Sequence, residues 1–242
     1  MEWKLLWVPP GRDKIKELLP LNGIRNSRTM SWRWHYAWAH FQRQLRLLSR
    51  HARHGRASFA GAPSARKAAE LGTLFAVVNA FLRDLQIDYA LAYGTLLGWH
   101  RERRILPHDR DIDFATPVAN YRAVWDARSR LPSGFTMHDT SHRHRGPKLY
   151  VDYRNWDADI YFFEEKDGHL ASLENCINPG DIAPFPRAYF FPVQRAEFLG
   201  QNTFVPAQPE ALLLHHYGYL GADGERDPVT RYFRPRRIPS SD

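Results

Sequence analysis

Three aspartates stand at alternate positions in one short stretch of the chain, at Asp109, Asp111 and Asp113. Side chains two residues apart point to the same side of a strand, so Asp111 and Asp113 should project together if the stretch is extended. A bare pair of this kind is common in loops, where it usually means solvated acids. Here the acids alternate with the core-type residues Ile112 and Phe114, and massed carboxylates repel one another unless a cation neutralises them. The pattern therefore predicts a site that holds a hard divalent cation against a phosphate.

The residues ahead of the acids suit an anionic ligand. Gly94 and Thr95 make a turn that opens a short helix, whose free backbone amides could face a phosphate. A basic run from His100 to Arg104 follows. This order predicts a strand, a glycine-opened helix, a basic loop and a second strand whose first residues carry the acids.

The stretch from Tyr89 to Phe114, YALAYGTLLGWHRERRILPHDRDIDF, resembles the signature of the LicD/fukutin family of nucleotidyltransferase-fold phosphotransferases. The likeness runs without a gap and is far more specific than a short acidic pattern. The residues that coincide with the signature are Gly94, Thr95, Leu96, Leu97, Gly98, Arg101, Pro107, Asp109, Asp111, Ile112 and Asp113. The positions that depart from it are Tyr93, Trp99, Arg104, His108 and Arg110. The key carboxylates are kept.

This resemblance implies a fold and an activity. The fold would be α+β, with a nucleotidyltransferase-like (polymerase beta-type) mixed sheet flanked by helices. The activity would be transfer of a phospho-alcohol, such as phosphocholine or ribitol phosphate, from a CDP-activated donor to a hydroxyl of a cell-surface glycan or its lipid-linked precursor, with release of CMP. Two alternatives remain: transfer of a nucleoside monophosphate with release of diphosphate, and a non-catalytic nucleotide-binding module. The presence of all the acids disfavours the module.

The resemblance also implies a third acid on a later strand, inside a run of the type V-D-I-F. The run from Asp159 to Phe162 matches that pattern best, and Asp157 and Asp152 compete with it. Asp159 would complete the site either as a ligand of a second ion or as the base for the acceptor hydroxyl.

The expected cofactor is Mg²⁺ or Mn²⁺, and the expected ligands and catalytic acids are Asp111, Asp113 and Asp159, with Asp109 as a further ligand. The Gly94–Thr95 turn would offer amides and a hydroxyl to the diphosphate, and Arg101 would pair with it as a fixed cation. The basic loop from His142 to Lys148, through Arg145 and Lys148, is a further candidate for diphosphate binding.

Hydrophobic periodicity predicts the elements that must position these groups. A helix should start at Ser64, with that serine as its N-cap, and continue to about residue 85. Beyond the motif, we expect a helix over 118–130, strands over 135–138, 148–153 and 157–163, a proline-rich crossing loop over 178–187, and a strand pair followed by a helix within 191–218. The first strand is expected over 87–93.

The 242 residues fit one domain of ordinary size with an appendage. We expect a basic, Trp-rich arm and amphipathic helix over 1–62, the catalytic domain over 63–222 and a loose basic tail over 223–242. The single cysteine, Cys176, excludes an internal disulfide framework and fits a reducing compartment. No apolar stretch predicts a signal peptide or a membrane span, so a cytoplasmic location is expected.

The net charge of +8 is concentrated before the catalytic domain, where no acidic residue occurs between Glu17 and Glu70. Within residues 31–54 an apolar face carries tryptophans, and a separate row consists of Arg43, Arg46, Arg50 and Arg53. This composition is typical of a helix that lies on an anionic membrane surface, which here would be the inner face. An alternative is a helix that packs on the catalytic domain. Nucleic-acid binding is a weaker interpretation, because nothing else resembles a reading module.

Overall fold

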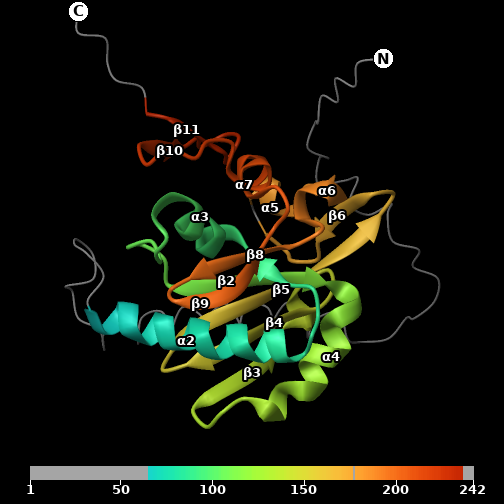
Figure 1. Ribbon diagram of the computed structural model, residues 1–242. Helices are drawn as coiled ribbons and strands as arrows, with labels where there is room; N and C mark the ends of the chain where they lie inside the picture. The colour runs from blue at the N-terminus through green and yellow to red at the C-terminus, as the bar shows by residue number, and fades with distance from the viewer. Residues whose placement is uncertain (1–64, 177, 237–242) are drawn as a thin grey trace, which may run out of the picture. The chain divides into compact units, whose positions relative to one another are not determined.

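A mixed sheet of seven strands forms the centre of the part of the chain that the structure describes (Figure 1). Its main path runs β1-β2-β5-β4-β3, while β6 pairs with β5 and β7 pairs with β6. The strands β2 and β5 are parallel, and every other pair in this sheet is antiparallel. In chain order the strands are β1 (Ala90–Leu91), β2 (Asp111–Pro117), β3 (Phe135–Asp139), β4 (Lys148–Tyr153), β5 (Trp156–Lys166), β6 (His169–Ser172) and β7 (Phe185–Pro186).

This computed structural model describes residues 65–176 and 178–236, which all belong to one compact unit. The predicted amino-terminal arm, the amphipathic helix over 31–54 with its membrane contact, the Ser64 cap and the boundary near residue 62 lie outside the described residues and stay predictions. The cytoplasmic location also stays a prediction. Among the described helices, none combines the length and the apolar character that crossing a bilayer requires.

Alternation along β2 separates the core from the acids. Ile112 and Phe114 are fully buried on one face, whereas Asp111 and Asp113 point to the other. The buried face packs against α2, where Phe75 stacks on Phe114 with ring centroids 5.9 Å apart. Each such fully buried side chain contributes about 1.5–3 kcal/mol of hydrophobic stabilisation. The core thereby fixes the orientation of the strand that carries the acids.

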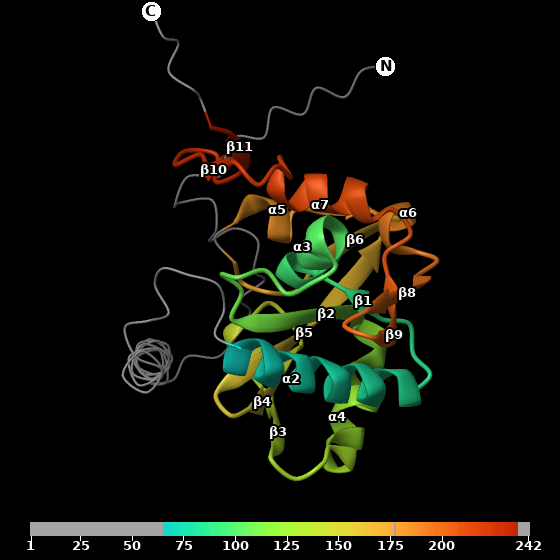
Figure 2. The same cartoon turned by 60° about the vertical axis from the view of Figure 1, so that its left-hand side comes forward.

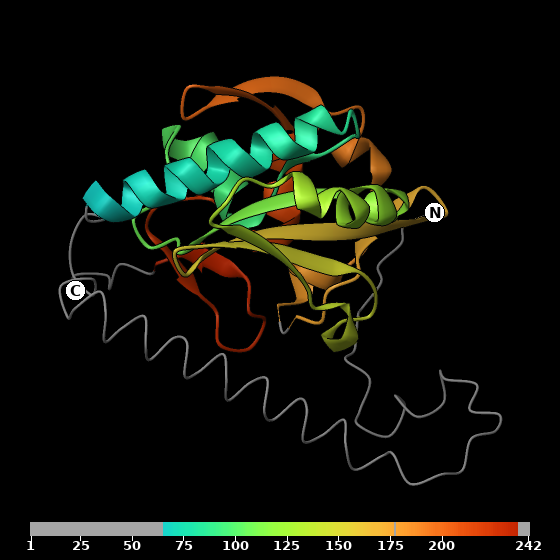
Figure 3. The ribbon, with the colours of Figure 1, turned by 90° about the horizontal axis from the view of Figure 1, so that it is seen from below.

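Helices cover both faces of the sheet. Figure 2 shows α2 on one side of β2 and β5, and α3, α5 and α7 on the other. Seen from below, α2 and the α4 region lie side by side along the same face (Figure 3). The helices and 3-10 turns are α2 (Ala65–Asp84), α3 (Tyr93–Glu102), η3 (Val118–Asn120), α4 (Tyr121–Asp126), η4 (Ala127–Arg130), η5 (Ser141–Arg143), α5 (Pro179–Ile182), α6 (Arg187–Phe190) and α7 (Pro209–Tyr217).

Most predicted elements are confirmed. The helix from residue 65, the helical stretch over 118–130, the third strand, the β4–β5 hairpin and the final strand pair with its helix all form. The strand pair is β8 (Gln194–Phe198) with β9 (Gln201–Val205). These segments have strong apolar periodicity and clear turn residues, so local sequence is sufficient to define them.

Three expectations need correction. The first strand is only Ala90–Leu91, and Tyr93, with a positive φ of 40°, begins α3 instead of extending the strand. Its ring lies 4.6 Å from that of Tyr161 and 4.8 Å from that of His216, so tertiary packing decides its conformation. The crossing loop over 178–187 contains α5 and β7.

The tail is the third correction, since residues 224–235 are not loose. They form the hairpin of β10 (Gly224–Arg226) and β11 (Phe233–Pro235). The side chain of Arg234 pairs with Glu225 at 3.2 Å and with Asp227 at 3.6 Å. Charges that suggested a solvated tail therefore find partners within the tail itself.

Candidate active site

The parallel register of β2 and β5 brings the predicted acids together. Asp111 lies opposite Asp157, and Asp113 lies opposite Asp159. One carboxylate oxygen from each of Asp111, Asp113 and Asp159 lies within 4.8 Å of the other two, and we call these three residues the carboxylate cluster. Of the three candidates for the third acid, Asp159 is the one in the cluster, whereas Asp157 and Asp152 are not part of it.

Burial and mutual repulsion determine the electrostatics of the cluster. Asp113 is only 5% exposed, and burial together with the charges of Asp111 and Asp159 raises its pKa well above the ordinary value. Burial and the neighbouring Asp159 raise the pKa of Asp111 to about 7. Such a set of carboxylates resists ionisation unless a positive charge is present.

The donor set fits a hard divalent cation. Mg²⁺ prefers oxygen ligands at about 2.0–2.1 Å in octahedral geometry, so neighbouring ligand oxygens lie roughly 3 Å apart. The carboxylate oxygens that the three residues offer lie within 4.8 Å of one another, which is close to that spacing. The carboxylate cluster therefore has the residue types and the spacing to hold Mg²⁺ or Mn²⁺.

Asp109 lies beside the cluster, at the amino-terminal end of α3. An ideal Cβ at Gly94 would be 3.2 Å from Oδ1 of Asp109 and 3.3 Å from Oδ2 of Asp113. Burial raises the pKa of Asp109, and its Oδ2 has no hydrogen-bond partner within the described residues. Gly94 is therefore a point of close approach where any side chain would crowd both carboxylates.

Thr95 links α3 to β2, the strand that carries the acids, through hydrogen bonds. Its hydroxyl oxygen accepts a hydrogen bond from the backbone N–H of Asp113 at 2.8 Å, and its own N–H donates to Oδ2 of Asp113 at 3.4 Å. Thr95 is only 2% exposed, so these contacts are shielded from water. In this structure Thr95 positions the carboxylate of Asp113. The predicted contact of Gly94 and Thr95 with a diphosphate remains a prediction.

Two lysines bring positive charge to the acids. Lys148, at the start of β4, is 4% exposed and places its Nζ 3.3 Å from Oδ1 of Asp159. Lys67 on α2 donates from its Nζ to the carbonyl oxygen of Pro107 at 3.0 Å and so holds the loop before the acids. Burial lowers the pKa of Lys67, while the charge of Asp109 opposes that effect. Lys67 is 42 positions before Asp109, and sequence spacing gives no signal for it.

The two predicted arginines donate hydrogen bonds to backbone carbonyls of later segments of the chain. Arg101 donates from Nε to the carbonyl oxygen of Leu220 at 2.6 Å and from Nη2 to that of Gly221 at 2.8 Å. Arg145 donates from Nη2 to the carbonyl oxygen of Ser172 at 2.6 Å. Both guanidinium groups therefore hold neighbouring segments, and their predicted contact with a diphosphate is not tested.

One buried tyrosine, Tyr161, contacts the acids, and the sequence did not indicate it. The hydroxyl of Tyr161 lies 3.4 Å from Oδ1 of Asp113 and 3.4 Å from Oδ2 of Asp159. Burial and the charge of Asp159 raise the pKa of Tyr161 well above its ordinary value, so it stays protonated and donates. Its position two residues after Asp159 on one strand is the signal that could have identified it.

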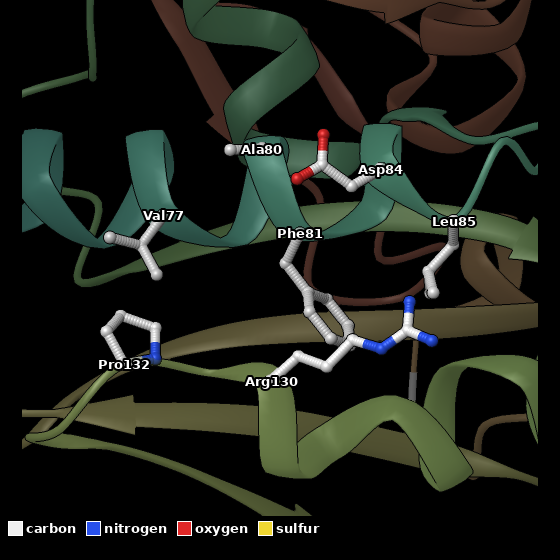
Figure 4. A pocket seen from close by; sticks show the side chains of 7 residues that line it. All are labelled: Val77, Ala80, Phe81, Asp84, Leu85, Arg130 and Pro132. Carbon is white, nitrogen blue, oxygen red and sulfur yellow. The ribbon is translucent and has the colours of Figure 1, made fainter.

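An apolar groove of about 240 Å³ lies elsewhere, between α2 and the turn that follows η4. Figure 4 shows the side chains around it, which are Val77, Ala80, Phe81, Asp84, Leu85, Arg130 and Pro132. None of them belongs to the carboxylate cluster. Asp84 and Arg130 are its only charged lining residues, and the rest of its lining is apolar.

Residues 86–208, just over half of the 242-residue chain, match the family model described as LicD/FKTN/FKRP, nucleotidyltransferase domain. Among curated proteins, the chain is 26% identical over 147 residues to "Ribitol-5-phosphate transferase FKTN" of Macaca fascicularis. It is 25% identical to the Homo sapiens protein of that name over the same length. Each alignment covers 57% of this chain and 30% of the relative, so the chain spans under a third of those proteins.

Two solved structures show distant likeness. One is ANT(2")-Ia in complex with adenylyl-2"-tobramycin, with a TM-score of 0.39 and 14% identity, covering 56% of this chain and 68% of that one. The other is the lincosamide antibiotic adenylyltransferase LnuA with lincomycin bound, with a TM-score of 0.39 and 16% identity, covering 70% and 93%. These likenesses are too distant to assign a substrate or a reaction.

Proposed function

The chain belongs to the LicD/FKTN/FKRP family of nucleotidyltransferase domains, and from that premise we propose that it transfers a phospho-alcohol from a CDP-activated donor to a glycan hydroxyl and releases CMP. The alcohol would be of the ribitol-phosphate or phosphocholine type, and the acceptor a cell-surface glycan or its lipid-linked precursor. The observation that carries this proposal is the carboxylate cluster, which lies inside the segment that matches the family. The name of the curated relatives supports a phospho-alcohol as the transferred group.

The carboxylate cluster would hold the divalent ion, with Asp109 beside it. When bound, an ion of this kind polarises the phosphate and takes up the negative charge that develops during displacement. The proposal therefore includes dependence on Mg²⁺ or Mn²⁺.

The chain's own residues would orient the reactants around that centre. The acceptor oxygen attacks the phosphorus that bears the alcohol, the bond from that phosphorus to the CMP oxygen breaks, and the hydroxyl proton passes to a carboxylate of the cluster. Thr95 holds Asp113 in position through its hydrogen bonds to that residue. The Tyr161 hydroxyl and the Lys148 ammonium contact Asp159 and keep its oxygens oriented toward the site.

A panel of CDP-alcohols with a glycan acceptor and Mg²⁺ or Mn²⁺ tests the proposal by mass spectrometry of the products. We expect CMP and an acceptor that has gained a phospho-alcohol. Asp113→Asn should abolish turnover and leave the protein folded, because losing one carboxylate relieves repulsion and opens no cavity. Release of diphosphate from a nucleoside triphosphate, with a nucleotide left on the acceptor, would instead establish nucleotidyl transfer.

A further inference from the structure

Lys148 is a buried cation beside the carboxylate cluster, and its ammonium lacks a hydrogen-bond partner among the described residues. Its side chain is 5% exposed, and its Nζ lies 3.3 Å from Oδ1 of Asp159 as an ion pair. Within residues 65–176 and 178–236, this nitrogen has no partner with hydrogen-bond geometry. The ammonium also lies over the ring of Tyr161. An ammonium carries three N–H donors, and leaving them unused in a buried site is costly, so a ligand oxygen is expected there.

Strand register determines where this ammonium lies. In the antiparallel pair of β4 and β5, Lys148 is opposite Tyr161, two residues beyond the pair of Tyr150 with Asp159. The long side chain of Lys148 therefore reaches Oδ1 of Asp159, the residue that could serve as a ligand of a second ion. In sites with two metal ions, the ions lie about 3.5–4 Å apart and clamp the attacking and leaving oxygens from both sides.

We propose that this centre holds a single divalent ion and that the Lys148 ammonium occupies the place of a second, where it binds an oxygen of the transferred phosphate. The inference rests on the proposed function, since it needs the cluster to bind an ion for phosphoryl chemistry. A second dication next to a fixed, buried ammonium would meet strong repulsion, because little water screens the two charges. The ammonium supplies positive charge to the phosphate at that position, and a lysine is a well-suited point charge for this purpose.

Counting Mn²⁺ ions per chain tests the proposal without measuring activity. The full chain is titrated with Mn²⁺, with and without inorganic diphosphate, and free Mn²⁺ is measured by electron paramagnetic resonance against a protein-free blank. We expect one ion per wild-type chain under both conditions. Lys148→Met, which removes the charge and keeps an apolar side chain of similar length, should bind a second ion at least 100-fold more tightly than the wild type does.

Two variants serve as controls. Lys148→Arg keeps the charge and should still bind one ion. Lys67→Met removes the other lysine near the acids, whose ammonium holds the carbonyl oxygen of Pro107, and should also bind one ion. Circular dichroism checks that each variant is folded, and Lys148→Gln replaces Lys148→Met if the latter does not fold.

The outcomes separate this inference from the proposed function. A wild-type chain that binds two spin-coupled Mn²⁺ ions overturns the inference and leaves phospho-alcohol transfer intact. A folded Lys148→Met or Lys148→Gln chain that still binds only one ion also overturns it. A wild-type chain that binds no ion contradicts both proposals. One ion in the wild type together with failure to use any CDP-alcohol contradicts the proposed reaction alone.

Discussion

Gly94 can be used to separate ion binding from stability. A Cβ at this position would lie 3.2 Å from Oδ1 of Asp109 and 3.3 Å from Oδ2 of Asp113, closer than nine in ten real Cβ contacts. The methyl group of Gly94→Ala would therefore force both carboxylates to shift by a few tenths of an ångström. Because Asp113 belongs to the carboxylate cluster, this shift should move a ligand oxygen away from the ion.

The magnitude follows from two opposing effects. Alanine is favoured over glycine inside a helix by about 0.8–1.0 kcal/mol, and less in the first turn, where Gly94 lies. Crowding of the two carboxylates opposes this gain, so the free energy of unfolding should change by less than about 1 kcal/mol. Divalent ions tolerate little error in ligand distance, and we expect Mn²⁺ affinity to fall at least about tenfold, or roughly 1.4 kcal/mol.

Urea unfolding and Mn²⁺ titration of the same preparations measure the two quantities. The matched control is Gly72→Ala in α2, where a Cβ would meet nothing within 4 Å. That variant should gain about 0.5–1 kcal/mol of stability and bind Mn²⁺ as the wild type does. Unchanged Mn²⁺ affinity in Gly94→Ala would refute the placement of the ion beside Gly94.

The remaining predictions concern the third acid, the threonine that holds the cluster, and acid stability. Asp159→Asn should abolish transfer while Asp152→Asn has a mild effect, and the opposite ranking in a CMP-release assay would show that the third acid is misassigned. Thr95→Val removes the acceptor for the buried N–H of Asp113 and should cost about 1–3 kcal/mol in urea unfolding, whereas Thr95→Ser should retain most of the stability. Burial alone would raise the pKa of Glu70, but the hydrogen bond from the Trp156 indole and the nearby Arg66 and Arg154 lower it overall. The stabilising contribution of ionised Glu70 is therefore complete above the unfolded pKa of about 4.5 and is lost as the pH falls through the folded pKa. Glu70→Gln should flatten the pH dependence of the free energy of unfolding in that window. An unchanged slope would contradict the lowered pKa of Glu70.

Local sequence predicts the strand that carries the first acids because its alternation is strong. Ile112 and Phe114 alternate with Asp111 and Asp113, and only one register buries the apolar pair and exposes the acids to a ligand. The third acid depends on strand pairing. The run from Asp159 to Phe162 resembles the family pattern and favours Asp159 as the third acid. The parallel register of β2 with β5 places Asp159 opposite Asp113.

Contacts between distant segments explain what the sequence could not predict. Lys67 reaches the loop before the acids from a helix some forty residues earlier in the chain. Arg101 binds the carbonyls of Leu220 and Gly221, about 120 positions later. Neither contact leaves a pattern in spacing or composition, because each depends on how whole elements pack. The sequence predicts Tyr93 in a strand, whereas it begins α3, because its conformation depends on packing against Tyr161 and His216.

The central claim is that the acceptor attacks the phosphorus that bears the alcohol, and isotope labelling tests it most directly. CDP-ribitol that carries ¹⁸O in the bridge between its two phosphates is incubated with the full chain, Mg²⁺ and a glycan acceptor, and the products are analysed by mass spectrometry. Phospho-alcohol transfer leaves the label in the released CMP. Label in released ribitol phosphate, with CMP joined to the acceptor, would contradict the claim and identify the protein as a nucleotidyltransferase.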